Sequence, residues 1–267
     1  MTQYYNNGIQ NYNSLTIMLR HAFAYGLTGQ FHYTWSHNLG TVGYENPFNL
    51  NGSYGSLATD IRHQVASDFL WNSPFKTGNK VVNQIITGWS IGVKLYLYSG
   101  QPFSVSDSKI GTDYNTSGGL SPLADLLVPS ETGANCNAGT AIGKPCLTLT
   151  DFATYPKSLG VPNTAGVPIQ TDWGNISADS FRGPAFFDVD AQIQRSFKIK
   201  ERVSLKLGFM ASNILNHPNF GNPSGTLTSG TFGQISGTVQ QATSIYGTGQ
   251  GASVSGRVGV FIGTISF

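Results

Sequence analysis

The sequence predicts an all-β fold, the C-terminal fragment of a transmembrane antiparallel β-barrel with about seven strands and long extracellular loops. Three observations lead to this expectation. Only 10% of the 267 residues are charged, against roughly 25% in an ordinary soluble domain. No stretch approaches the roughly 20 consecutive apolar residues that a membrane-spanning helix needs. Apolar side chains instead recur at every second position, which is the period of a strand with one apolar and one polar face.

Composition decides between the two ways of crossing a membrane and excludes one class of partner. Every backbone N–H and C=O must be paired inside lipid, so a chain without spanning helices has a closed β-barrel as its remaining option. The net charge is +2, from 15 basic and 13 acidic residues. No basic tract gives nucleic acid an electrostatic footprint, and we expect outer-membrane lipid as the partner of the apolar surface.

The clearest alternation is a hairpin near the C-terminus. From Phe187 to Ile199, apolar residues occupy every second position, and Arg195 alone breaks that face. Residues 203–211 repeat the pattern, and the stretch from Lys198 to Arg202 between them is typical of a tight turn. The pair predicts a hairpin with one face toward lipid and one toward water.

Four earlier segments alternate in the same way, and a weaker one ends the chain. The earlier segments cover residues 15–25, 27–35, 61–71 and 89–97. The last runs from Arg257 to Phe267, and the face opposite Phe267 is less polar because it carries valine and isoleucine. These segments and the hairpin together make up the expected strands.

The connections between the expected strands alternate in length. The shorter ones are residues 24–28, 72–88 and 198–202, and the longer ones are residues 38–59, 107–184 and 213–252. Successive connections of antiparallel strands lie at opposite ends, so all the long ones fall at one end. Outer-membrane barrels have this arrangement, with short periplasmic turns and long extracellular loops.

The same count places the C-terminus on the periplasmic side. There the terminal Phe267 would meet the barrel-assembly machinery. It also gathers aromatic residues at the periplasmic rim, where such barrels carry an aromatic girdle. The expected girdle consists of Tyr25, Trp71, Trp89, Phe197 and Phe267.

A soluble β-sandwich or solenoid also alternates and is the competing fold. Exposed faces of soluble sheets usually carry many lysines and glutamates, whereas the polar faces here are mainly Ser, Thr, Gln and Gly. Loops as long as residues 107–184 are also uncommon in compact soluble domains. A soluble β-rich binding protein is therefore the less favoured expectation.

Three motifs resemble the C-terminal barrel of the TonB-dependent receptor superfamily, particularly its Oar-like group. They are FRGPAFFDVD at residues 181–190, ASNILNHPNFGNP at 211–223 followed by FGQI at 232–235, and Gly88-Trp89 leading to YSGQPFSV at 98–105. The resemblance implies a receptor barrel of about 22 strands with a plug inside it. Residues 1–267 would be its C-terminal portion, and the signal peptide, the plug and the TonB-engaging motif are not recognisable in this sequence.

The resemblance also implies a function and partners. A TonB-dependent receptor takes up a solute across the outer membrane, here an unidentified one, and engages the TonB complex through its N-terminal region, which this sequence lacks. The alternative is an Oar-like surface adhesin or scaffold barrel without transport. Under either interpretation the protein would reside in the cell outer membrane.

Charged residues on the polar faces are the candidates for a substrate path. They are Arg20, His32, Arg62, Asp68, Lys94, Asp188, Asp190 and Lys206. They could contact a plug or line a solute path, or they could form a hydrated wall of cross-strand charge pairs.

No residue is expected to be catalytic, and no metal or cofactor is expected. Asp188 and Asp190 look like an acid–base pair, but on a strand both would point into a wide polar lumen without the burial that shifts a pKa. The histidines are too scattered for a metal motif. Cys136 and Cys146, the only cysteines, lie in one loop of an exported protein, which predicts a disulfide; two unpaired thiols are the alternative.

Overall fold

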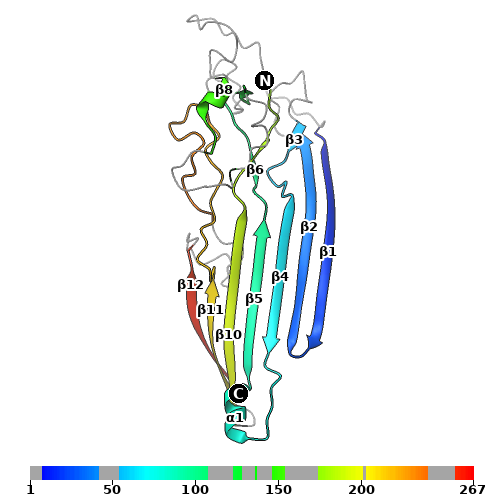
Figure 1. Ribbon diagram of the computed structural model, residues 1–267, viewed down its shortest axis with the longest axis vertical. Coiled ribbons are helices and arrows are strands. Elements are labelled where there is room, and N and C mark those ends of the chain that lie inside the picture. Colours follow the sequence, from blue (N-terminus) through cyan, green and yellow to red (C-terminus); the bar gives the residue numbers. More distant parts are fainter. Residues whose placement is uncertain are drawn as a thin grey trace, which may run out of the picture.

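The main body of the protein is one antiparallel sheet in a computed structural model (Figure 1). The structure describes residues 8–41, 54–107, 123–127, 136, 146–153, 174–200, 203–239 and 256–267. The long strands follow the order β1-β2-β4-β5-β10-β11-β12. They are β1 (Gln10–Ala24), β2 (Leu27–Thr41), β4 (His63–Asn72), β5 (Trp89–Tyr98), β10 (Phe186–Lys200), β11 (Val203–Ser212) and β12 (Val258–Ser266). Each predicted strand is present, and the antiparallel all-β fold is confirmed.

The first two strands are longer than the sequence predicts. β1 begins at Gln10 and β2 continues to Thr41, whereas alternation supports strands only from residue 15 and to residue 35. The additional residue pairs of the β1–β2 ladder carry polar residues on both faces, such as Asn11 and Asn38. A period-two hydrophobic pattern detects only the part of a strand whose two faces meet different solvents, so these extensions are invisible to it.

The register of the sheet aligns the apolar sides of all seven strands. Leu15 is opposite Trp35, Val65 is opposite Leu97, and throughout the ladder odd-numbered residues pair with odd-numbered residues, except beyond irregularities at the ends of two hairpins. Because side chains alternate along a strand, all odd-numbered residues lie on one side. We call this side the odd face and the opposite one the even face.

The odd face is apolar and exposed. Leu19 on β1 is 63% exposed and Phe261 on β12 is 85% exposed, and large hydrophobic side chains of the intervening strands are exposed as well. An exposed apolar surface of this extent indicates contact with a membrane or another apolar partner. The soluble sandwich, in which such faces meet in a dry interior, is contradicted.

The hydrophobic core lies outside the long strands. Its members come from the connections between β5 and β10 and between β11 and β12, with Phe181 and Val105 completely buried. The Phe181 ring lies 5.8 Å from the rings of both Phe103 and Phe152. We call the seven long strands the wall, and the described residues of the β2–β4, β5–β10 and β11–β12 connections the cap. The cap therefore has a hydrophobic core, and the wall has none (Figure 1).

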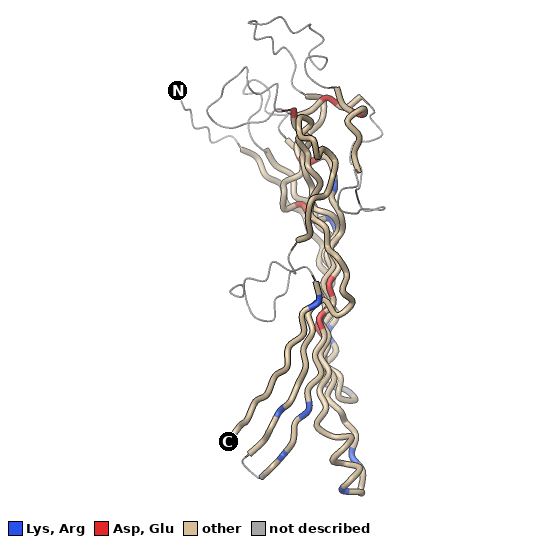
Figure 2. Tube along the Cα trace, turned by 90° about the vertical axis from the view of Figure 1, so that its left-hand side faces the viewer, with Lys and Arg blue, Asp and Glu red and all other residues tan. Residues whose placement is uncertain are grey.

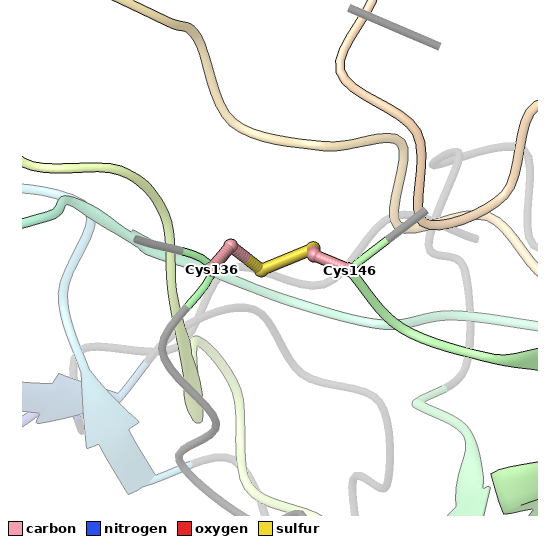
Figure 3. Close-up of a disulfide and its surroundings, with 2 residues drawn as sticks. All are labelled: Cys136 and Cys146. Atoms are coloured by element: carbon pink, nitrogen blue, oxygen red, sulfur yellow. A yellow bond between two sulfur atoms is a disulfide. The ribbon is translucent and has the colours of Figure 1, made fainter. Parts of the chain in front are cut away.

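A disulfide joins Cys136 to Cys146 inside the cap (Figure 3). Their Cα atoms are 5.4 Å apart. The Cys136 amide donates to the Arg182 carbonyl at 3.0 Å, and the Cys146 amide donates to the Gly233 carbonyl at 2.8 Å. The bridge thus links two backbone segments that already pair with distant parts of the cap.

The connections sort by length between the two ends of the sheet, as predicted. The cap lies at one end, and short connections lie at the other (Figure 1). Tyr25 and Gly26 join β1 to β2 with φ angles of 52° and 80°, which is typical of a type I′ hairpin turn. A side chain at Gly26 would lie 2.0 Å from the Asn72 carbonyl oxygen. The connection from β4 to β5 contains a helix, α1 (Lys80–Ile86), which the sequence analysis does not predict.

The expected long loop at residues 107–184 contains short strands where it is described. β6 (Pro102–Phe103) pairs with β9 (Phe181–Arg182), and β7 (Asp125–Leu126) pairs with β8 (Phe152–Ala153). A further short strand, β3 (Tyr54–Ser56), pairs with the upper end of β2. Residues 240–252 of the second expected loop lie outside the described residues.

The two faces should respond in opposite ways to an added charge at the same depth. Ile193→Arg places a guanidinium on the odd face near the middle of β10 and should cost about 2–4 kcal/mol of stability in lipid. Gln192→Arg, one residue away on the even face, should cost less than about 1 kcal/mol because the charge meets water. Denaturant titration in phospholipid vesicles measures both, and equal costs would contradict the assignment of faces.

Candidate functional site

A row of polar residues crosses the even face of five adjacent strands. In register, Arg20 faces Gln30, Gln30 faces Asp68, Asp68 faces Lys94, and Lys94 faces Asp190. The Gln30 side-chain amide donates to the Asp68 carboxylate at 2.8 Å. We call these five residues the polar row. Opposite charges directly across a ladder stabilise a sheet, and the row thereby brings together four of the eight predicted candidates.

The other four candidates lie elsewhere. His32 and Asp188 belong to the next row toward the cap, in register through Ala66 and Tyr96. Lys206 faces Ser196 nearer the short connections. Arg62 precedes β4 and therefore does not line the even face of a strand; its Nε donates to Asp60 at 3.1 Å.

Hollows follow one another along the even face and meet at the polar row. The first is lined by His32, Gln64 and Tyr96 on the cap side of the row. The second lies over Gly92 and Gln192, whose side chain occupies the space that a side chain at Gly92 would need. A third lies nearer the short connections and is lined by side chains that include Lys206. Asp68 and Lys94 border the first two hollows, so solvent on this face reaches the row.

The two aspartates of β10 are buried, contrary to the expectation from the sequence. Asp188 is 1% exposed and Asp190 is 6% exposed. The chain after β11 stays against β10: the Asn213 amide donates to the Asp190 carboxylate at 3.0 Å and the Ile214 amide to the Val189 carbonyl at 2.8 Å. Both carboxylates lie on the even face as expected, but the expectation that they escape burial there is wrong.

A buried aspartate that the sequence analysis did not single out joins the wall to the cap. The Asp60 side chain is fully buried, forms ion pairs with Arg182 and Arg62, and lies 3.2 Å from the Nδ1 atom of His37. The Asn38 amide also donates to it, at 2.7 Å. Burial alone would raise the pKa of Asp60, but the hydrogen bonds from Arg182, Asn38 and His37 hold it well below its usual range. The carboxylate is therefore charged at any physiological pH.

Asparagines of the second motif continue the ladder where β11 ends. The Asn219 side chain accepts from the Phe187 amide at 2.8 Å and donates to the Phe187 carbonyl at 3.0 Å, as a neighbouring strand would. Asn213, with a φ of 46°, uses its side chain in the same two-way manner with the backbone of His217, at 2.9 and 2.8 Å. The motif therefore has a structural role at the junction of wall and cap.

The five predicted girdle residues lie at the end with short connections. Tyr25 is in the β1–β2 turn, Trp71 and Trp89 are at the facing ends of β4 and β5, Phe197 is near the end of β10, and Phe267 follows β12. Arg195, which interrupts the odd face, lies 5.1 Å from the Trp89 ring centroid and 4.6 Å from that of Phe197. A cation between aromatic rings suits the membrane–water boundary.

An exposed apolar face, a solvated polar face and long connections at one end are the features of an outer-membrane barrel wall. The chain matches, over residues 1–246, the model of a family described as the outer membrane beta barrel domain. It belongs to this family. No curated protein and no solved structure matches the chain. Among the described residues, no helix has the length and apolar character needed to span a membrane.

Membership of the outer membrane beta barrel domain family orients the sheet. The protein resides in the outer membrane, as predicted, with the odd face toward lipid and the even face, with its polar row, toward the lumen. Figure 2 shows how few charged residues the wall carries. This arrangement can present a hydrated, locally charged surface to a solute or to a protein segment inside the barrel.

The two buried aspartates should respond oppositely to removal of their charge. Asp60→Asn leaves the Arg182 guanidinium without its buried partner and should cost about 3 kcal/mol. Asp188→Asn should be neutral or stabilising, because neither Asp188 carboxylate oxygen has a hydrogen-bond partner of normal geometry among the described residues. Thermal unfolding in detergent micelles, with limited proteolysis of the cap, measures both. Similar losses in the two variants would contradict this assignment.

The Asp60 contribution should depend on pH in the direction set by its lowered pKa. It is fully present above the ordinary carboxyl value of 3.8 and is lost as the pH falls from there toward the lower pKa of the folded protein. The cap of the unaltered protein should therefore become more protease-sensitive below about pH 4. Asp60→Asn should show less of this acid dependence.

Proposed function

We propose that the wall belongs to a TonB-dependent receptor that takes up a solute across the outer membrane. The observation that carries the proposal is the polar row, a band of alternating charge across the lumen side at the level where two hollows meet. The three sequence motifs support the same class. The wall itself contributes binding and passage and no chemical step.

The edges of the sheet support a wide barrel. Within the described residues, β1 pairs only with β2, and β12 pairs only with β11. Backbone groups on such edges must be paired in lipid, so further strands are needed to close the wall. A barrel of the receptor class, with about 22 strands, has a lumen wide enough to hold a plug. The polar row then faces the plug or the solute.

The proposed partners follow from this arrangement. The cap captures the solute outside the cell, and the TonB complex acts on a plug inside the barrel. The exposed Phe267, which directly follows β12, is the proposed contact for the barrel-assembly machinery.

A surface adhesin or scaffold is the second candidate. The observation that favours it is the cap, which has its own hydrophobic core and a disulfide. A folded cap of this kind can present a stable binding surface to other cells or to matrix. In that case no solute passes along the lumen side of the wall, and the polar row only stabilises the sheet.

Uptake measurements separate the two candidates. Cells carrying the complete receptor gene would be given a panel of labelled ferric siderophores, cobalamin and oligosaccharides, with and without TonB. Transport predicts TonB-dependent accumulation of at least one class of solute. Cell attachment that persists without TonB, together with unchanged accumulation of every solute, would favour the adhesin and contradict the receptor.

Neutralising one residue of the polar row tests its role in passage. Asp68→Asn keeps an oxygen that can accept from Gln30 but removes the charge beside Lys94, so assembly should be normal. Uptake of the transported solute should change severalfold if the row lines the path. Lys198→Gln, a charge change on the same face of β10 near the short connections and away from the row, is the control for uptake. Unchanged uptake in the Asp68 variant would show that the polar row does not line the solute path.

A further inference from the structure

The connection between β4 and β5 carries an exposed apolar surface at the periplasmic end. Phe75 is 57% exposed, Val81 66%, Val82 40% and Ile85 61%. These four residues, which we call the periplasmic patch, come from one short segment around α1. Exposed hydrophobic residues that cluster in this way usually mark an interaction surface.

The helix is held in shape by polar side chains and not by burial of its apolar face. The Asn79 side chain caps it by accepting from the amides of Val81 and Val82 at 3.0 and 3.3 Å. The Asn83 side chain forms two hydrogen bonds with the backbone of Thr77. A helix of one or two turns is marginal alone in water, so these bonds fix a conformation in which no helix residue is buried.

The apolar residues of α1 share one side of the helix. Val82 and Ile85 follow Val81 by one and four positions, which places all three on one face of a helix with 3.6 residues per turn. Lys80 and Gln84 lie outside that stripe. The segment is therefore amphipathic, and its apolar stripe has no covering element among the described residues.

The periplasmic patch is continuous with the lipid-facing surface of the wall. The Trp89 indole, on the odd face, donates to the Ile85 carbonyl at 2.9 Å. The Trp71 ring, also on the odd face, lies 6.1 Å from the Phe75 ring. Figure 1 shows α1 below the lower ends of β4 and β5. The two tryptophans thus attach the segment to the odd face at the level of the aromatic girdle.

The charge of the segment suits a phospholipid surface. Lys76 and Lys80 are exposed, and no aspartate or glutamate occurs between residues 72 and 89. In Figure 2 the lowest part of the described chain carries basic residues and no acidic ones. Lysine side chains beside an apolar stripe reach toward phosphate groups while the stripe enters the acyl boundary.

We propose that residues 73–88 form an interfacial anchor in the inner leaflet of the outer membrane. The periplasmic patch enters the boundary between headgroups and acyl chains, and Lys76 and Lys80 lie against the phosphates of anionic phospholipids. The anchor goes beyond solute uptake, since it requires only that the odd face meet lipid. It fixes the depth and tilt of the β4–β5 hairpin in the bilayer.

Tryptophan placed on either side of the helix tests the anchor. The complete barrel that contains this chain, as Val82→Trp or as Gln84→Trp, is reconstituted in vesicles of phosphatidylethanolamine and phosphatidylglycerol. Part of the lipid is brominated near the carbonyl end of its acyl chains, which quenches nearby indoles, and the signal of the unaltered protein is subtracted. Both positions are exposed, so neither substitution disturbs packing.

The anchor predicts that the added indole of Val82→Trp is quenched by brominated lipid at least about twofold more than that of Gln84→Trp. In the Val82→Trp background, Lys76→Gln with Lys80→Gln should reduce this quenching in anionic vesicles and leave it unchanged in phosphatidylcholine. Acrylamide should instead quench Gln84→Trp more strongly. Equal lipid quenching at both positions, or stronger acrylamide quenching at position 82, would overturn the proposal.

Discussion

The odd-to-odd register of the sheet is the constraint on which the rest of the protein depends. A slip by one residue in any pair would turn the apolar side of one strand toward the lumen and its polar side toward lipid. Leu15, Trp35, Val65 and Leu97 share one surface only because each ladder keeps the same parity. Backbone pairing within lipid and separation of the two solvents are thus satisfied by the same register.

The wall and the cap solve the problem of burial in different ways. The wall transfers its apolar side chains to lipid, so it needs no internal core. The cap is surrounded by water and buries Phe181 and its neighbours as a soluble domain does. At their junction, Asp60 of the cap pairs with Arg182 and accepts from the Asn38 amide of β2. The Asn219 side chain pairs with the backbone of Phe187, where β11 no longer does. Polar groups therefore join two regions that share no continuous apolar core.

Sequence alone predicts the wall well because lipid and water act on alternate residues. The same logic fails where both faces of the chain meet similar surroundings. This applies to three features: the ends of β1 and β2 near the cap, the burial of Asp188, and the cluster around Asp60. Each depends on which distant segments of the chain cover it. Helix α1 is not predicted because a segment of seven residues with four apolar positions is too short for its periodicity to distinguish a helix from a loop. Four residues of the polar row were among the predicted candidates, but Gln30 was not, and the alignment of the row requires the register.

Two buried aspartates illustrate how position decides the role of a charge. Asp60 and Asp188 are equally inaccessible, yet only Asp60 is surrounded by cationic and amide donors. Burial of a charge costs free energy unless partners replace its water. Asp60 therefore fixes the geometry of three segments, whereas Asp188 bears the desolvation cost beside Asp190. The same side chain thus stabilises the junction of wall and cap at position 60 and weakens the wall at position 188, because only the first position replaces the lost water with donors.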